Sequence, residues 1–225
     1  MDKFDLDKYD RECKIELKQL EVNYRSNPND VDLAIKYSDR LRSSIFASFS
    51  MPAFQTHPTR RDEIITYKEL LKALTEVFQR HSNNEEIALN YLEGIVKYPY
   101  CIEQAVDKMI EVVRRFPNSD RAKGKCGLGI WFLAHDVFDR DYQSAQKYGE
   151  ILGKLYVKTG FEGFATNYSK VLQLLACKQL GFFEKRHIIS ELKKLSEQFP
   201  NNETILDNYL LVADRRAWEK RQGYR

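Results

Sequence analysis

Apolar residues recur three and four positions apart along almost the whole chain, with polar residues between them. This spacing is seen in Ile15, Leu17, Leu20 and Tyr24, and again in Leu70, Leu71, Leu74, Val77 and Phe78. It places one apolar stripe on each of a series of helices, whereas a strand would alternate every second residue. The pattern therefore predicts an all-α protein.

Short polar breaks separate the predicted helices. Four of them, at residues 26–30, 81–86, 116–120 and 199–203, contain Asn, Ser or Asp, which can cap the helix that follows. The helices are expected at about residues 2–25, 29–47, 60–81, 84–98, 100–116, 119–136, 141–158, 161–180, 184–199 and 202–221.

The breaks and the helices beside them repeat one another. Residues 77–92 align with residues 195–210, and the match includes an Asn-Asn-Glu run and an Asn-Tyr pair. Equivalent positions, called the anchors below, are Tyr37, Tyr91, Cys126, Tyr168 and Tyr209. After a first interval of 54 residues, the anchors are 35, 42 and 41 residues apart, which is typical of helix-pair repeats.

These junctions resemble those of the tetratricopeptide repeat family, in which a helix ends before Pro-Asn and a capped apolar helix follows. Residues 139–152, with Tyr142 and Ala145, are similar to that family's turn into a second helix. The resemblance implies a right-handed α-solenoid of about four antiparallel helix pairs, with capping helices at both ends. The spacings exceed the family's ~34 residues, and small residues occur only in places. A HEAT-like or otherwise divergent solenoid is the alternative.

The chain is expected to form a single domain over residues 1–225, because no Pro-, Gly- or Ser-rich boundary divides it. Residues 1–25 and 201–225 would be the charged capping helices, and residues 26–200 the repeats. An insertion at 48–59 carries Phe49, Met51 and Phe54, which either pack against neighbouring helices or form a contact surface.

Composition narrows the class of protein. The 225 residues are 43% hydrophobic and 31% charged, without an apolar run near the ~20 residues of a membrane span. The charged N-terminus does not resemble a signal peptide, so a cytoplasmic location is expected. The four cysteines (Cys13, Cys101, Cys126 and Cys177) form no Cys-x-x-Cys pair, and we expect reduced, mostly buried thiols without a disulfide or zinc.

Catalytic signatures are missing from the sequence. It lacks the common phosphate-loop, dinucleotide, esterase and metalloprotease motifs. The glycines of residues 124–130 favour close helix packing, and the cluster His135, Asp136, Asp139 and Asp141 favours capping at a helix end over a metal or acid–base site. We expect a protein that is not an enzyme and holds no cofactor and no metal.

Candidate binding residues come from the resemblance, which implies that the first helix of each pair lines a concave, peptide-binding surface. The residues before the anchors are Lys36, Asn90, Lys125, Asn167 and Asn208, and Arg121 precedes Lys125 by one turn. Asn can pair with a peptide backbone and Lys with a carboxylate, which suits an extended, partly acidic ligand. Alternatively, these are ordinary solvated positions. Six aromatic residues are predicted to fill the core: Tyr91, Phe116, Trp131, Phe132, Phe199 and Tyr209.

The resulting hypothesis is a non-enzymatic adaptor or regulator that binds a protein or peptide segment. The net charge is only +3, but residues 151–225 carry 13 basic and 8 acidic side chains. The alternative is therefore a nucleic-acid-binding helical repeat that uses Lys178, Lys185, Arg186, Lys193, Lys194, Arg215 and Arg216. Self-association through the capping helices or residues 48–59 is a third hypothesis.

Overall fold

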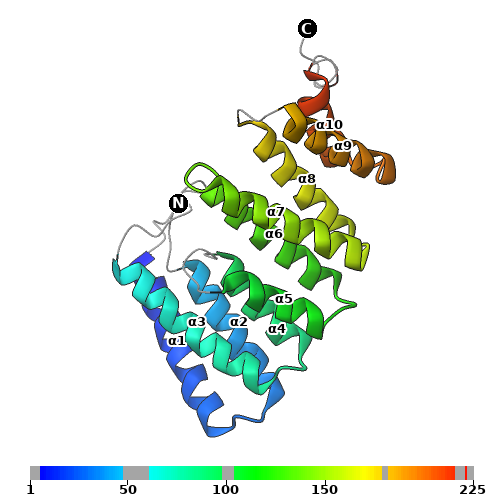
Figure 1. Cartoon of the computed structure of the whole chain (residues 1–225). Helices are drawn as coiled ribbons and strands as arrows, with labels where there is room; N and C mark the ends of the chain where they lie inside the picture. Colours follow the sequence, from blue (N-terminus) through cyan, green and yellow to red (C-terminus); the bar gives the residue numbers. More distant parts are fainter. Residues whose placement is uncertain (1–5, 48–60, 98–103, 179–181, 216–220, 222–225) are drawn as a thin grey trace. The chain divides into compact units, whose positions relative to one another are not determined.

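The computed structural model describes residues 6–47, 61–97, 104–178, 182–215 and 221. Over these residues the chain forms ten helices and no strand (Figure 1). Their bounds are α1 Leu6–Ser26, α2 Val31–Ala47, α3 Arg61–Arg80, α4 Glu85–Lys97, α5 Ala105–Arg115, α6 Asp120–Val137, α7 Tyr142–Thr159, α8 Glu162–Ala176, α9 Phe182–Gln198 and α10 Glu203–Ala213. The all-α prediction is confirmed. No helix in these ranges is both long enough and apolar enough to cross a membrane.

The helices divide into two compact units, residues 1–116 with α1 to α5 and residues 117–225 with α6 to α10. Each unit has its own buried apolar side chains. The single-domain organisation inferred from the sequence stays a prediction, and the two units are treated separately below.

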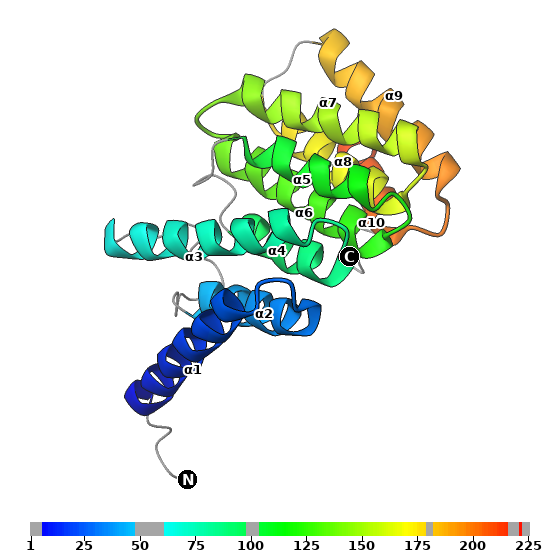
Figure 2. The same cartoon turned by 90° about the horizontal axis from the view of Figure 1, so that it is seen from below.

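In unit 1, α2 packs against α1, α3 and α4, and α4 packs against α3 and α5 (Figures 1 and 2). Fully buried side chains from α2, α3 and α4, such as Ile45, Leu74 and Ile87, fill the space between these helices. Gly94 allows α4 to approach closely, because a Cβ atom there would lie 2.9 Å from Leu74 Cδ2. The Tyr67 hydroxyl donates a hydrogen bond of 3.1 Å to the Gly94 carbonyl oxygen, which fixes α3 against α4.

In unit 2, α8 is the central helix and packs against α6, α7, α9 and α10. Its buried Phe164 belongs to a core that includes Ile130 of α6, Leu152 of α7 and Leu192 of α9. The α6 helix also packs against α7, and α9 against α10. Within this unit, each helix thus packs against the next helix along the chain or the one after it.

Polar side chains cap the N-termini of α2, α4, α6 and α10. The side-chain oxygens of Asp30, Asn84, Ser119 and Asn202 each accept a hydrogen bond of 3.0–3.1 Å from the backbone N–H three residues later. Each cap lies seven residues before an anchor, as the aligned breaks require. The predicted capping role of these breaks is confirmed, and so is the capping role of Asp141, which accepts from the Ser144 N–H at the start of α7.

Several helix boundaries differ from the prediction, among them the end of α8, which lies at Ala176 and not at 180. Helix α5 begins at Ala105 and not near residue 100, because Gln104 has a φ of 57° and a ψ of 32°, in the left-handed region. Helix α10 ends at Ala213 and not at 221, because Asp214 leaves helical geometry with a φ of −147°. The predicted insertion at 48–59 lies outside the described residues.

Candidate functional site

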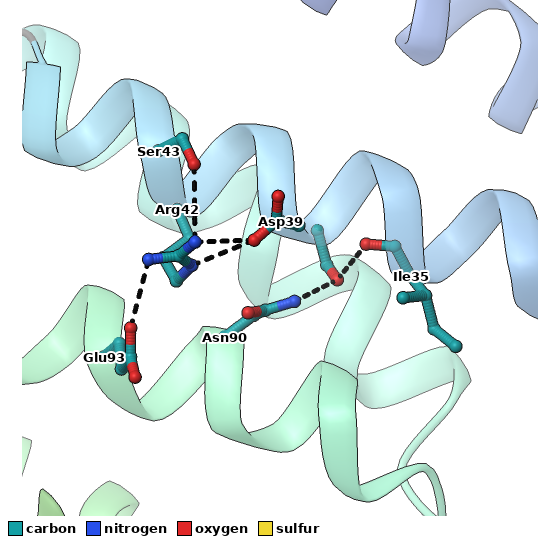
Figure 3. A network of polar contacts seen from close by, with 7 residues as sticks. Ile35, Asp39, Arg42, Ser43, Asn90 and Glu93 are labelled. Atoms are coloured by element: carbon teal, nitrogen blue, oxygen red, sulfur yellow. Dashed lines mark hydrogen bonds and ion pairs between the residues drawn. The ribbon is translucent and has the colours of Figure 1, made fainter.

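Two of the asparagines expected on an open surface lie in the interior. The side chain of Asn90 is 5% exposed, and its Nδ2 donates a hydrogen bond of 2.9 Å to Ser38 Oγ on α2 (Figure 3). Ser38 is fully buried and donates in turn to the Ile35 carbonyl oxygen at 2.9 Å. Asn90 therefore fastens α4 to α2, and its predicted exposure is wrong.

The same arrangement occurs in unit 2. Asn208 of α10 donates through Nδ2 to Ser169 Oγ of α8 at 2.9 Å, and Ser169 donates to the Thr166 carbonyl oxygen at 2.8 Å. Because Ser38 and Ser169 each follow an anchor, and Asn90 and Asn208 each precede one, the two pairs occupy equivalent repeat positions. Unlike Asn90, Asn208 stays partly exposed.

Asn167 occupies the equivalent position on α8 but meets a glycine where the other pairs have serine. A Cβ atom on Gly127 of α6 would lie 3.0 Å from Asn167 Nδ2 and 3.1 Å from Phe164 Cδ1. With its side chain only 8% exposed, Asn167 donates to the Gly163 carbonyl oxygen of its own helix at 2.9 Å. Its predicted exposure is wrong, while the packing role predicted for the glycines near residue 127 is confirmed at Gly127.

On α2 the surface residues form a polar network that satisfies its own charges (Figure 3). Arg42 Nη2 lies 2.6 Å from Asp39 Oδ1, and Arg42 Nη1 lies 3.2 Å from Glu93 Oε2 on α4. Burial alone would lower the pKa of Arg42, but the hydrogen bonds and charges of Asp39 and Glu93 outweigh it and raise this pKa. Lys36 lies exposed on the same helix.

The corresponding positions on α6 carry a different set of side chains. Residues spaced by three and four positions share one side of a helix. We define the α6 stripe as six residues on this side that are not fully buried: Arg121, Lys125, Leu128, Trp131, Phe132 and His135. Phe132 is 37% exposed, and His135 and Arg121 are exposed as well. The α6 stripe therefore begins with two basic side chains, continues with three apolar ones and ends at His135, with Lys125, Leu128 and Trp131 half-buried.

The aromatic end of the α6 stripe is held in place by its neighbours. The Trp131 ring lies with its centroid 5.0 Å from that of Phe132 and 5.8 Å from that of His135. From α8, Lys170 Nζ lies 5.0 Å from the Trp131 ring centroid, within cation–π range. These contacts restrict the orientations of the rings.

Acidic groups around α6 are engaged in ion pairs of their own. Asp120 pairs with Lys123 at 3.0 Å, and Asp136 pairs with Arg140 at 2.8 Å. Asp139 at the end of α6 lies 3.5 Å from Lys178 Nζ. Arg121 and Lys125 thus share their side of α6 with one carboxylate, Asp136, four residues after Phe132 and paired with Arg140, and both basic residues also make contacts within the protein.

The structure places the six predicted candidates in three settings. Lys36 and Asn90 belong to unit 1, Arg121 and Lys125 share the α6 stripe, and the last two belong to unit 2, where Asn208 bonds α10 to α8 and Asn167 bonds within α8. The sequence analysis missed Leu128, Trp131, Phe132 and His135 as surface residues. Their spacing from Lys125 by three, six, seven and ten positions was the available signal.

Other candidate chemistry is scattered. Among the residues that the structure describes, no three His, Cys, Asp or Glu side chains converge in a way that could hold a metal ion. Cys126 is buried and free, and burial raises the pKa of its thiol to about 12. Cys177 is free and exposed. His81 Nε2 lies 3.0 Å from the Pro28 carbonyl oxygen and ties two helix junctions together.

The basic residues of the nucleic-acid hypothesis are dispersed over the end of α8, over α9 and after α10. Lys178, Lys193 and Lys194 each pair with a carboxylate, at 3.5, 3.6 and 2.7 Å. Arg186 and Arg215 also interact within the protein, and Arg216 lies outside the described residues. One exposed aromatic residue lies beside them, since Phe183 of α9 is 84% exposed and precedes Lys185 by two residues.

Comparison with known proteins is negative on all three counts. No protein-family model, no curated protein and no solved structure matches this chain. The site is therefore judged on its own geometry.

Proposed function

We propose that the chain is a non-enzymatic helical-repeat protein that binds a peptide segment of a protein partner along the α6 stripe. The fold proposed for it is a divergent α-solenoid similar to tetratricopeptide arrays. The equivalent caps, the equivalent Asn–Ser pairs and the next-neighbour helix contacts within each unit support that proposal.

The observation that carries the proposal is the combination of basic and aromatic side chains on one open face of α6. Covering the exposed part of Phe132 and the flanking apolar groups would contribute part of the ~1.5–3 kcal/mol that full burial of a large apolar side chain is worth. Arg121 and Lys125 would favour carboxylates one or two turns away, at about 0.5–1 kcal/mol for each exposed pair. The preferred ligand is thus an acidic segment with an apolar or aromatic residue.

Peptide selection tests this proposal. A random peptide library displayed on phage is selected against the wild-type protein and against the double variant Lys125→Glu with Phe132→Ser. We expect the wild type to enrich Asp or Glu next to an aromatic or large aliphatic residue. The affinity of the enriched peptide, measured by calorimetry, should fall at least about tenfold in the double variant, which corresponds to ~1.4 kcal/mol.

A matched control is available on α9. Phe183 and Lys185 are exposed residues of the same types in the same unit, and the double variant Phe183→Ser with Lys185→Glu makes the same residue substitutions and charge change, with Phe183 84% exposed and Phe132 37% exposed. This control should bind the selected peptide as the wild type does. Equal losses in both double variants, or tighter binding of a single-stranded oligonucleotide than of any peptide, would exclude the α6 stripe as the peptide site.

A further inference from the structure

A cavity of about 280 Å³ opens between α1, α2 and α3 of unit 1. Helices α1 and α3 both pack against α2 (Figure 1), which closes one side of the cavity. The lining consists of Tyr24 and Arg25 of α1, Tyr37 of α2, and Ala73, Glu76, Val77 and Arg80 of α3. The volume is just below the usual range for drug-sized ligands, so the cavity suits a small molecule and not a peptide segment.

The anchor residue Tyr37 brings a hydroxyl group that the protein leaves without a hydrogen bond. Its side chain is only 5% exposed, and no residue that the structure describes forms a hydrogen bond with this hydroxyl. At the equivalent anchor Tyr91, in contrast, the hydroxyl is hydrogen-bonded to Thr75, and the Phe78 ring stacks on the tyrosine with a centroid distance of 4.6 Å. The repeat can thus satisfy an anchor hydroxyl internally, whereas Tyr37 borders the cavity and favours a ligand with an acceptor oxygen.

Two opposite charges of the lining have no ion-pair partner. Glu76 and Arg80 are exposed and lie four positions apart on α3, so they share one side of that helix. Neither forms an ion pair with the other or with any further residue that the structure describes. Arg80 donates a hydrogen bond to the Tyr24 hydroxyl oxygen and keeps other N–H groups for a ligand. Because Arg25 already pairs with Glu21 at 2.6 Å, one positive and one negative group remain in the cavity.

Ring contacts restrict the two tyrosines of the lining. The centroid of the Tyr24 ring lies 5.3 Å from that of Tyr37 and 6.0 Å from that of His81. His81 is itself tied to the junction before α2, since its Nε2 lies 3.0 Å from the Pro28 carbonyl oxygen. A ligand therefore meets hydroxyl groups on restricted rings, which lowers the entropic cost of binding.

We propose that the cavity beside Tyr37 binds a free α-amino acid with an aliphatic side chain. The carboxylate of the ligand would accept hydrogen bonds from the Tyr37 hydroxyl and from Arg80, and its ammonium group would donate to Glu76. The aliphatic side chain would lie against Ala73 and Val77, the apolar members of the lining. A purely anionic ligand would face Glu76 and a purely cationic one Arg80, whereas an amino acid matches both charges. The site lies in unit 1 and shares no residue with the α6 stripe of unit 2, so it is a further function beside peptide binding.

Titration with valine, leucine and alanine, followed by nuclear magnetic resonance of the full chain, tests the ligand class. Valine is then compared with isobutylamine, which lacks its carboxylate, and with isovalerate, which lacks its ammonium group. Because the site supplies a partner for each charge, valine should bind at least about tenfold more tightly than either analogue. No saturable binding of any of the three amino acids, or an analogue that binds as tightly as valine, would overturn the proposal.

Variants then locate the binding. Tyr37→Phe removes only the hydroxyl group and should weaken valine binding at least about fivefold. Glu76→Gln should lose the preference for valine over isovalerate, whereas Glu69→Gln, an exposed change two turns earlier on α3, should keep it. These substitutions keep the size of each side chain and are expected to preserve the fold, which circular dichroism verifies.

Unchanged valine affinity in Tyr37→Phe, or an unchanged preference in Glu76→Gln, would refute the site. The double variant of the α6 stripe should bind valine as the wild type does, which separates this test from that of the proposed function.

Discussion

Removing the hydrogen bond between Asn90 and Ser38 tests whether the asparagines before the anchors fasten the helices together. The perturbation is a double-mutant cycle of Asn90→Ala, Ser38→Ala and the combined variant. Both side chains are buried, and their hydrogen bond of 2.9 Å joins α2 to α4. The two residues are 52 positions apart in the sequence.

The structure gives the expected magnitudes. Ser38→Ala leaves the buried amide of Asn90 without its acceptor, which costs ~1–3 kcal/mol. Asn90→Ala removes the donor and also leaves a void, so its cost is at least as large. In the combined variant the unsatisfied amide is absent, and the coupling free energy should be about 1 kcal/mol in favour of the pair. Asn208 and Ser169 provide a second cycle, with smaller losses because Asn208 is partly exposed.

The assay is urea unfolding followed by far-ultraviolet circular dichroism, with hydrogen exchange of α2 and α4 to show that unit 1 is the part affected. Single losses below about 0.5 kcal/mol and a coupling within about 0.3 kcal/mol of zero would refute the reasoning.

Four further substitutions have expected outcomes in the free energy of unfolding, measured by urea titration. Gly127→Ala should destabilise by ~1–3 kcal/mol because its Cβ would press on α8, whereas Gly124→Ala, with nothing within 4 Å, should stabilise by up to ~1 kcal/mol. Asn202→Ala removes the cap of α10 and should cost ~1 kcal/mol. Burial raises the pKa of Tyr37 from 10.0 to about 12, so this tyrosine ionises at a lower pH in the unfolded chain than in the folded one. The free energy of unfolding should therefore fall as the pH rises from 10 to 12, and Tyr37→Phe should make this fall shallower.

Much of the helical framework was predictable because its signals are local. The spacing of apolar residues located α2 and α7 to within two residues, and the caps at Asn84 and Asn202 follow from the chemistry of short polar side chains. The boundaries that failed, at Gln104 and Asp214, depend on single backbone conformations that residue type does not dictate.

Exposure of the site residues could not be predicted in the same way. Lys125 and Asn167 occupy equivalent positions, yet Lys125 stays partly exposed and Asn167 is buried. A short amide side chain can be buried between helices, whereas burying a long charged side chain is costly. Whether an asparagine finds an inner partner depends on a residue in another repeat, as Ser38 does for Asn90. Phe132 was expected in the core because it is aromatic, but its helix turns it outward, and it is 37% exposed.

The fluorescence of Trp131 is the most direct test that a peptide occupies the α6 stripe. The sequence has two tryptophans, so Trp218→Phe leaves Trp131 as the single reporter, in contact with Phe132 and His135. Titration with the selected acidic peptide should change the Trp131 emission and saturate at the dissociation constant found by calorimetry. Binding of the peptide with no change in Trp131 emission would contradict the account.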